Sequence, residues 1–354
     1  MKDPKKQYAS LLLKWNQKSN KRIMPWKGEK DPYLIWLSEI ILQQTRVEQG
    51  MPYFLNFKKN YPTVAKLALA KEDEVMKLWQ GLGYYSRARN LHETAKNIQA
   101  NYKGRFPETF IELKKLKGVG DYTASAIASF AFGEKKAVVD GNVIRVLARV
   151  FGIETAFDTT TGKKQFATLA EELIDEKEPG NYNQAIMDFG ATVCTPKNPD
   201  CNNCPFNSFC IGFTKNRIDE LPVRGKKIEI KERYFNYLVI KSSSQILIQK
   251  RTASDIWKNL YQLPVLETSK PLTKNFHADI AAFLGNKQFV ITSYSKATVQ
   301  MLTHRKIHFR FIDIEMKDFK KFSFKGTQKI KISDLNKFAF PKTIHLYLNE
   351  KFLF

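Results

Sequence analysis

The sequence lacks the long apolar run of a membrane protein, and it is short of acidic residues. Its longest apolar stretch, residues 33–42, is well below the roughly 20 residues that a membrane-spanning helix needs, and it contains Glu39. The charged start MKDPKKQ is followed by no apolar signal segment, so we expect an intracellular, cytoplasmic protein. Only 35 acidic residues stand against 58 basic ones, which leaves a net charge of +23. That excess favours a polyanionic partner, either nucleic acid or an anionic membrane.

The two parts of the chain differ in apolar periodicity. With 354 residues, 43% of them apolar, the chain is neither disordered nor collagen-like and is long enough for two domains. Through residue 213 the apolar spacing predicts helices, for example over 31–49, 86–101, 121–132 and 142–151. After a basic connector, alternation predicts strands over 234–240, 245–249, 298–304 and 307–314, with short helices over 275–284 and 343–349. We therefore predict an all-α domain (1–213), a linker (214–232) and an α+β domain (233–354).

Cysteine is scarce, and all four copies lie close together. They are spaced C-x6-C-x2-C-x5-C, at Cys194, Cys201, Cys204 and Cys210. Disulfides are not expected in an intracellular chain, so four thiolates on one metal centre are the better account. Zinc and a [4Fe–4S] cluster both accept four cysteines, and unrelated free thiols remain the plain alternative. Four protein ligands leave no open position, which favours a structural role over a catalytic one.

A glycine-containing turn stands between two expected helices in residues 112–132. Gly118 and Gly120 lie in LKGVGDYTASAIASF, beside Lys114, Lys115 and Lys117. Glycine lets backbone N–H groups approach a phosphate without a Cβ in the way. The pattern resembles a helix-hairpin-helix motif, which grips DNA phosphate and reads no sequence. The plainer interpretation is an ordinary tight turn between helices.

Two carboxylates stand in apolar surroundings. Glu39, in YLIWLSEIILQQT, is expected to be desolvated, which raises its pKa toward the range of a general acid. Asp140, in AVVDGNVIRVLARVF, opens a helix whose N–H groups could keep it ionised. A protonated acid and a fixed anion together are the pair that cleaves a glycosidic bond. Taken singly, Glu39 on a wet helix face and Asp140 as a plain N-cap are the simpler interpretations.

Six segments of the first domain resemble the adenine DNA glycosylase family of helix-hairpin-helix enzymes. They are RIMPWKGEKDPYLIWLSEIILQQTRVE, LWQGLGYYSRARNLH, FPETFIELKKLKGVGDYTASAIASFAFG, VVDGNVIRVLARVFG, NQAIMDFGATVC and the cysteine loop 194–210. The resemblance implies an all-α helix-hairpin-helix glycosylase domain with a [4Fe–4S] cluster on the four cysteines. It implies a base-excision repair enzyme that flips adenine out of a mispair with 8-oxoguanine or guanine and hydrolyses its N-glycosidic bond. We expect a monomer on such double-stranded DNA, away from membranes and on the nucleoid if the chain is bacterial.

The resemblance also implies roles for single residues. Glu39 matches the general acid that protonates adenine N7, Asp140 the carboxylate that stabilises the sugar cation, Tyr122 a phenol close to that centre, and Asn142 an amide that supports the acid and water. Taken alone, Tyr122 would be a packing residue and Asn142 an ordinary residue at a helix start. Lyases of the endonuclease III branch carry Lys at the position of Tyr122, and some bacterial relatives carry Lys at that of Ile144. We therefore expect a monofunctional glycosylase that uses water.

Two further groups of residues match family positions that meet DNA. The expected DNA-binding residues are Gln44, Tyr84, Arg87, Gly118 and Gly120, and the expected adenine-pocket residues are Arg22, Trp26 and Asp188. The family inserts the residues at the Gln44 and Tyr84 positions into the duplex, where they fill the gap that flipping leaves. Without the resemblance these groups would be an ordinary helix amide, a loop aromatic, a surface arginine, a core tryptophan and a solvated aspartate.

Residues from about 233 onward resemble the family's C-terminal domain, which shares the Nudix fold of 8-oxo-dGTP hydrolases. The segments that carry this resemblance are RTASDIWKNLYQLP and MLTHRKIHFRF. No metal-holding run of carboxylates stands in residues 265–300, so we expect a binder of 8-oxoguanine and not a hydrolase. Leu302, Thr303 and His304 match a Phe-Ser-His loop that approaches the lesion, with Leu302 replacing the aromatic ring. The plainer interpretation of this trio is a strand end with a solvated histidine.

Two other functions would account for part of this pattern. A thymine/uracil–guanine mismatch glycosylase of the same superfamily would also carry Tyr122 and Asp140. Glu39 in the WLSEIILQQT context and the long second domain argue against it. A catalytically silent mismatch-binding protein would have no need to keep Glu39, Tyr122, Asp140 and Asn142 together.

Overall fold

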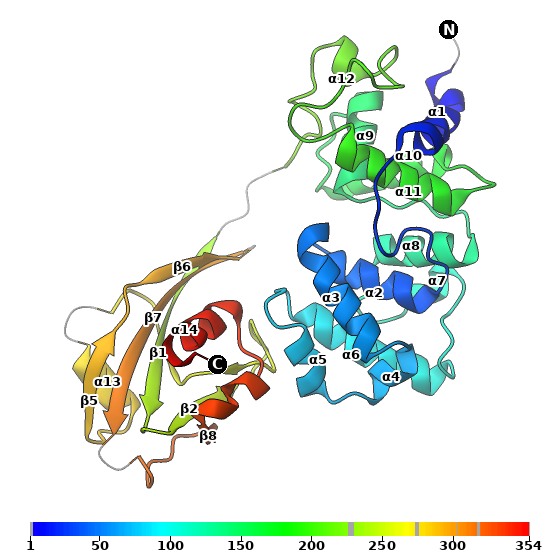
Figure 1. The fold of residues 1–354 in the computed structure, drawn as a ribbon. Helices are drawn as coiled ribbons and strands as arrows, with labels where there is room; N and C mark the ends of the chain where they lie inside the picture. Colours follow the sequence, from blue (N-terminus) through cyan, green and yellow to red (C-terminus); the bar gives the residue numbers. More distant parts are fainter. Residues whose placement is uncertain (1–2, 226–229, 273–275, 303, 317–318, 354) are drawn as a thin grey trace. The chain divides into compact units, whose positions relative to one another are not determined.

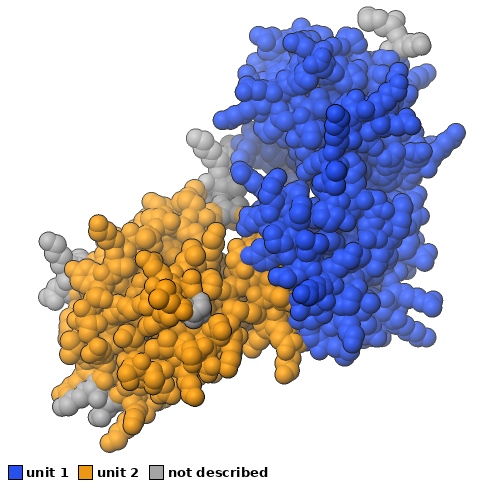
Figure 2. All heavy atoms as spheres, in the orientation of Figure 1, with its two compact units in different colours: residues 1–70, 90–226 blue, residues 71–89, 227–354 orange. Residues whose placement is uncertain are grey.

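A computed structural model describes residues 3–225, 230–272, 276–302, 304–316 and 319–353, and the chain forms two compact units. The first comprises residues 1–70 and 90–226, and the second residues 71–89 and 227–354 (Figure 2). Within the described residues, no helix combines the length and the apolarity that crossing a membrane requires.

The first unit is helical throughout its regular elements (Figure 1). Its helices are α1 (Pro4–Ser19), α2 (Pro32–Leu42), α3 (Val47–Asn60), α4 (Val64–Leu69), most of α6 (Ser86–Asn101), α7 (Phe110–Leu113), α8 (Asp121–Phe132), α9 (Gly141–Phe151), α10 (Thr160–Leu173), α11 (Pro179–Thr192) and α12 (Ile211–Thr214). The expected all-α first domain is therefore confirmed. Helix α2 packs against α3 and α8, while α11 packs against α1, α8 and α9, so α2, α8, α9 and α11 come together around one region.

The helix expected over residues 31–49 is in fact two helices. Asp31 begins α2, where its side chain accepts a hydrogen bond from the Tyr33 N–H at 2.9 Å, and Pro32 occupies the first turn. Helix α2 ends at Leu42, and Gln44 takes a left-handed φ of +55° before α3 begins at Val47. The apolar pattern ran through the break because residues 41–47 keep helix-like spacing, and a left-handed glutamine leaves no periodic signal.

The second unit contains a mixed sheet between two helices (Figure 1). Its elements are α5 (Glu72–Leu78), β1 (Lys231–Lys241), β2 (Gln245–Lys250), β3 (Tyr261–Gln262), β4 (Val265–Thr268), α13 (His277–Phe283), β5 (Phe289–Tyr294), β6 (Thr298–Met301), β7 (Arg305–Met316), β8 (Thr327–Lys331), a 3-10 helix (Ile332–Lys337) and α14 (Lys342–Phe352). Strands follow the order β3-β2-β1-β7-β5, with β1 and β7 parallel. The α+β class of this domain is confirmed.

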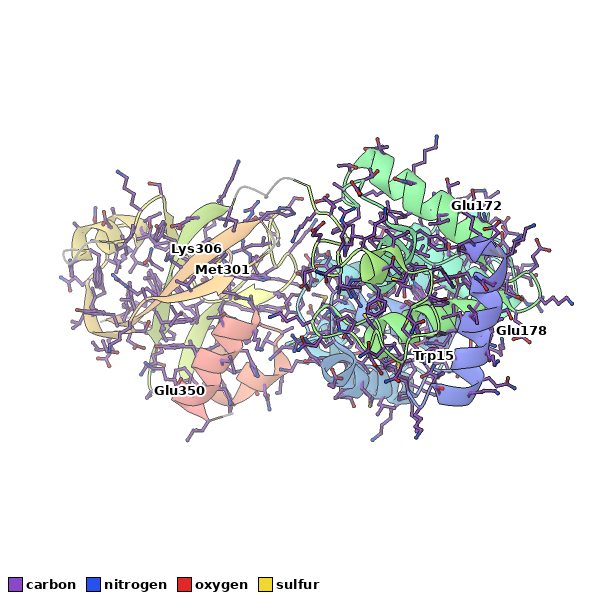
Figure 3. All side chains as sticks on the ribbon, turned by 90° about the horizontal axis from the view of Figure 1, so that it is seen from above. Trp15, Glu172, Glu178, Met301, Lys306 and Glu350 are labelled. Atoms are coloured by element: carbon purple, nitrogen blue, oxygen red, sulfur yellow. The ribbon has the colours of Figure 1, made fainter. Side chains whose placement is uncertain are left out.

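Alternation along the long strands explains the two layers of the second unit. Phe235 and Tyr237 of β1 face a core that Ile344 and Leu348 of α14 complete, whereas Leu238 belongs to the opposite core with α13. Strand β6 pairs antiparallel with β7, so Met301 and Lys306 lie opposite each other on the sheet (Figure 3). The turn between these strands carries Leu302 and His304, while Thr303 lies outside the described residues.

Residues 71–89 belong with the second unit, although they precede it by more than a hundred positions. The Lys250 ammonium pairs with Asp73 at 2.7 Å, and the Arg89 guanidinium donates to the Lys258 carbonyl at 2.8 Å. The division at residues 213 and 233 did not anticipate this grouping, because these contacts join distant parts of the chain. The exact domain limits stay a prediction.

We predict that Gly162→Ala destabilises the first unit. A Cβ at Gly162 would lie 2.1 Å from the Ala156 carbonyl oxygen, a backbone atom that cannot turn away. We expect a loss of about 2–3 kcal/mol in the free energy of unfolding, measured by urea denaturation. Thr161→Ala, at the exposed neighbouring position of α10, is the matched control. Equal stability of the two variants would contradict the packing argument.

Candidate active site

A cavity of about 450 Å³ in the first unit brings together the four expected catalytic residues. Glu39 comes from the middle of α2, Tyr122 from the first turn of α8, and Asp140 and Asn142 from the start of α9. We call it the Glu39 cavity; its other lining residues are Arg22, Met24, Trp26, Leu42, Gln43, Gln44, Thr45, Val47, Gly141, Gln184 and Met187. Residues separated by a hundred positions in the sequence therefore share one enclosure.

The Glu39 side chain is withdrawn from water. The residue is 7% exposed, and its neighbours in α2 from Tyr33 to Ile41 are buried as well. Burial raises the pKa of the Glu39 carboxyl to about 7, the Asp140 charge acts in the same direction, and a hydrogen bond with Tyr122 opposes both. Near neutral pH a large fraction of the Glu39 carboxyl is therefore protonated, as a general acid must be.

Asp140 caps α9 from inside the same cavity. Its Oδ1 accepts the Val143 N–H at 2.8 Å, and its Oδ2 accepts the Asn142 amide at 2.8 Å. Burial nevertheless raises the pKa of Asp140 above its ordinary value, although these hydrogen bonds and Arg145 lower it. The expected hydrogen bond from the helix N–H is present, but the loss of hydration outweighs the groups that lower this pKa.

Tyr122 interacts electrostatically with both carboxyl groups, Glu39 and Asp140. Its hydroxyl donates to the Met187 sulfur at 3.3 Å. Burial first, and then the charges of Glu39 and Asp140, raise the pKa of Tyr122 well above its ordinary value. The phenol is therefore a neutral hydrogen-bond donor at every physiological pH, and no amine stands at this position.

Asp188, one of the expected adenine-pocket residues, is a fully buried carboxylate with two cationic partners. Asp188 is 0% exposed and pairs with Arg22 at 2.9 Å and with Lys27 at 2.9 Å. Arg22 and Trp26 line the Glu39 cavity, whereas Asp188 is not part of that lining and reaches it through its ion pair with Arg22. The sequence pattern did not single out Lys27 or Gln184. The Gln184 amide also donates to Asp188, at 3.0 Å. An aspartate inside the apolar helix NQAIMDFGATVC was the available signal, because a buried carboxylate requires cationic partners.

Arg145 is another functional residue that the sequence pattern did not single out. Its guanidinium donates to the Asn142 amide oxygen at 2.9 Å, to the Gly190 carbonyl at 2.6 Å and, through Nε, to the Cys194 carbonyl at 2.7 Å. One turn later Arg149, 2% exposed, donates to the Thr195 carbonyl at 2.7 Å. Helix α9 therefore ties the Asp140–Asn142 pair to the start of the cysteine loop. Arginines four apart on one helix face were the signal, since they point the same way.

The cysteine loop gathers suitable donors. Burial raises the pKa of Cys204 to about 12, and the thiols of Cys194, Cys210 and Cys201 act in the same direction, whereas the Phe206 N–H opposes them. The Phe206 N–H donates to the Cys204 sulfur at 3.4 Å, and Arg149 approaches the Cys194 sulfur at 3.6 Å. Four sulfurs with cationic and N–H partners fit an anionic metal–thiolate centre. Among the described residues, however, no three potential ligands are already arranged around a metal position, so the centre stays a prediction.

The residues expected at DNA differ in how the fold presents them. Gln44 is exposed at the rim of the Glu39 cavity. Gly118 has a φ of +77°, and a Cβ there would lie 2.8 Å from Asn90, whereas a Cβ at Gly120 would meet nothing within 4 Å. Gly118 thus shapes the turn, and Gly120 leaves open space before α8.

Tyr84 and Arg87 lie in the segment that belongs to the second unit. Tyr84 is 48% exposed and has a φ of +48°. Arg87 is only 8% exposed, with its guanidinium 5.5 Å from the Tyr84 ring and 5.1 Å from that of Trp79. Burial lowers the pKa of Arg87 to about 10. The Arg87 guanidinium therefore packs on the face of the Tyr84 ring, and little of its surface is accessible to a phosphate.

Leu302 and His304, two of the residues expected to read the lesion, line a second cavity, of about 370 Å³, within the second unit. Leu302 is half-buried and His304 exposed, and they share this cavity with Tyr84 and Trp257. We call it the Trp257 cavity. Its location brings the expected lesion-reading turn beside the expected inserting tyrosine.

Both parts of the chain are similar to known protein families. Residues 37–176 match the model of the HhH-GPD superfamily of base excision DNA repair proteins, and residues 236–350 match that of the NUDIX domain. The adenine DNA glycosylase of Buchnera aphidicola subsp. Schizaphis graminum is 39% identical over 74% of this chain and 75% of its own length. The human protein of that name is 44% identical over 57% of this chain and 39% of its own length. A thermostable thymine-DNA glycosylase structure matches 60% of this chain and 97% of its own, with 31% identity and a TM-score of 0.55.

We predict that Glu39→Gln stabilises the protein at high pH. The pKa of Glu39 is about 7 in the folded protein and 4.5 in the unfolded chain. Below pH 4.5 the carboxyl is protonated in both states and its burial carries no charge penalty. As the pH rises from 4.5 toward 7, the unfolded chain loses this proton first, so the folded state becomes less stable relative to it. Above pH 7 the neutral amide removes a cost of about 3 kcal/mol. Urea unfolding at pH 8 should show the gain, and the gain should shrink steadily toward pH 4. Glu48→Gln, exposed in α3, should show neither effect.

Proposed function

This chain belongs to the adenine DNA glycosylase family, and from that premise we propose that it excises adenine paired with 8-oxoguanine or with guanine in double-stranded DNA. It is a base-excision repair enzyme, a hydrolase of N-glycosidic bonds. The observation that carries the proposed mechanism is the Glu39 cavity, where a carboxyl with a pKa near 7 faces a second, hydrogen-bonded carboxylate.

In the proposed reaction, adenine leaves the duplex and enters the Glu39 cavity. Glu39 gives a proton to N7 of the base, so the bond between the sugar C1′ and N9 breaks with its electron pair on a neutral leaving group. The sugar becomes an oxocarbenium ion, which the Asp140 carboxylate stabilises. A water molecule then adds to C1′ and loses a proton, leaving an abasic site and free adenine.

Tyr122 argues for a glycosylase without lyase activity. A lyase step needs an amine that attacks C1′ and forms a Schiff base. Tyr122 stands where the endonuclease III branch carries lysine, and its phenol keeps its proton. Water is therefore the nucleophile in this proposal. The Tyr122 hydroxyl also interacts with Glu39 and opposes the rise in the pKa of that carboxyl.

The contacts of Asp188 support the proposed adenine pocket. Its buried carboxylate fixes the Arg22 side chain at the wall of the Glu39 cavity and also pairs with Lys27. Arg22 and Trp26 then present a cationic donor and a flat ring to a planar base.

DNA contact in this proposal uses two kinds of surface. The turn at Gly118 and Gly120 offers backbone N–H groups to phosphate, and Gln44 at the cavity rim, together with Tyr84, enters the duplex beside the mispair. The second unit, whose Leu302 and His304 line the Trp257 cavity, meets the base opposite adenine.

We further propose that Cys194, Cys201, Cys204 and Cys210 hold a [4Fe–4S] cluster. When bound, the cluster would supply a rigid cross-link for the loop and no chemistry on the base. Arg149 donates to the Cys194 sulfur and the Phe206 N–H donates to the Cys204 sulfur, so both would help to balance the negative charge of the bound group. The loop then gives Arg145 a fixed carbonyl, and Arg145 positions Asn142 beside Asp140.

A thymine–guanine mismatch glycosylase is the second candidate, since a solved thymine-DNA glycosylase is 31% identical to this chain. That structure covers 60% of this chain, whereas the Buchnera adenine enzyme extends over 74% of it. A thymine enzyme would also have no use for a buried acid that protonates a purine nitrogen.

The decisive experiment is single-turnover cleavage of duplexes that hold A opposite 8-oxoguanine, A opposite G, or T opposite G. We expect strand breaks only after hot alkali, fastest with A opposite 8-oxoguanine. Glu39→Gln should lose at least about a hundredfold in rate and still bind the mispair. The wild-type rate should fall as the pH rises through about 7, where Glu39 loses its proton. Cleavage of T opposite G with adenine untouched would overturn the proposal.

Arg145→Lys tests the link between the cysteine loop and Asn142. Lysine keeps the charge but cannot donate to the Asn142 and Cys194 carbonyl oxygens at once. We expect the single-turnover rate to fall about tenfold or more, with duplex affinity nearly unchanged. Lys164→Arg, exposed in α10, is a control for the general effect of exchanging these residues. A rate equal to that of the wild type would show that Asn142 holds its place without Arg145.

A further inference from the structure

Trp257, which lines the cavity named after it, has a backbone conformation that bulky residues avoid. Its φ is +59°, in the left-handed region, where aromatic residues are outliers. Asn259, two positions later, has a φ of +67°. Strain of this kind persists only where the surroundings impose it, and it gathers at ligand sites.

The surrounding loop imposes this conformation through several hydrogen bonds. The Leu260 N–H donates to the Trp257 carbonyl at 3.1 Å, and the Arg251 N–H donates to the Leu260 carbonyl at 2.9 Å. The Arg251 guanidinium also donates to the Ile256 carbonyl at 3.0 Å. On the far side, Asn259 bonds Glu72 of α5 at 2.5 Å, so the loop is tied to the segment that carries Tyr84.

The indole ring itself is held from behind by the core. Phe309 lies nearly parallel to it, with ring centroids 6.0 Å apart and planes at 26°, and Phe235 meets it edge-on at 6.0 Å. The ring is thus half-buried and preset in orientation, which lowers the entropy lost when a flat partner stacks on it.

The polar lining of the cavity is basic in character. Both Asp255 oxygens are already occupied, Oδ1 by Arg233 and Arg305 and Oδ2 by Arg233 and Arg251. Although burial opposes ionisation, Arg233, the Ile256 N–H and Arg251 lower the pKa of Asp255 to about 2. Asp255 therefore serves to fix the arginines, and Arg89 and Arg305 offer donors to an acceptor-rich ligand.

We propose that Trp257 is the aromatic platform on which the purine opposite adenine stacks, in place of the ring that Leu302 does not provide. The proposal rests on the proposed function and adds a binding residue to it. Trp257, Leu302 and Tyr84 line one cavity, so a base that enters beside Tyr84 meets the indole. Every purine has a flat face, so Trp257 contributes affinity for both guanine and 8-oxoguanine, and other groups discriminate between them.

The test compares binding of full-length Trp257→Leu and wild type to duplexes that carry a cleavage-resistant 2′-fluorinated deoxyadenosine. The opposite position holds 8-oxoguanine, guanine or an abasic analogue that has no base to stack. Loss of the indole should weaken binding about tenfold opposite either purine, and less than about twofold opposite the abasic analogue. Trp257→Phe should keep most of the affinity, and Leu302→Phe added to Trp257→Leu should restore much of it.

Tyr294→Leu is the matched control, an exposed aromatic of β5 outside the cavity, and it should bind all three duplexes as the wild type does. Thermal unfolding of each variant separates misfolding from lost stacking. Equal weakening on all three duplexes, or no weakening, overturns the inference. Failure of the proposed function is distinguishable, because the wild type would then not cleave adenine at all.

Discussion

Desolvation of the Glu39 carboxyl is the constraint on which the first unit depends. A carboxyl in the middle of a buried helix costs folding free energy, and α2 tolerates it because Tyr122 bonds it and the cavity beside it is polar. The same cost raises its pKa to about 7, where a proton can be given up to a base. The loss in stability and the proposed chemistry are therefore two results of one burial.

Helix α9 connects that cavity to the cysteine loop over two turns. Its N-terminus carries Asp140 and Asn142, and its next two turns carry Arg145 and Arg149, which bond backbone carbonyls at Cys194 and Thr195. A change in the loop can reach the carboxylate through one rigid helix. In the proposed function, this helix gives the cysteine loop a direct route to the reacting residues.

The second unit is linked to the first part of the sequence through residues 71–89. Their ion pair with Lys250 and the hydrogen bond to Lys258 bring Tyr84 to the turn that holds Leu302 and His304. A domain that matches the NUDIX model thus shares a cavity with a segment from the helical half of the chain. In the proposed function, the residue that enters the duplex and the turn that meets the opposite base are held by one set of contacts.

The sequence by itself determined the two fold classes, the family, the candidate residues and the burial of Glu39, because periodicity and apolar context are local and are written along the chain. Only the tertiary structure decided the break at Gln44, the raised pKa of Asp140, the burial of Arg87 beneath Tyr84, and the cationic partners of Asp188. Each of these depends on which distant side chains meet and how much water they displace. Desolvation and pairing are properties of that three-dimensional arrangement, and no local pattern encodes them.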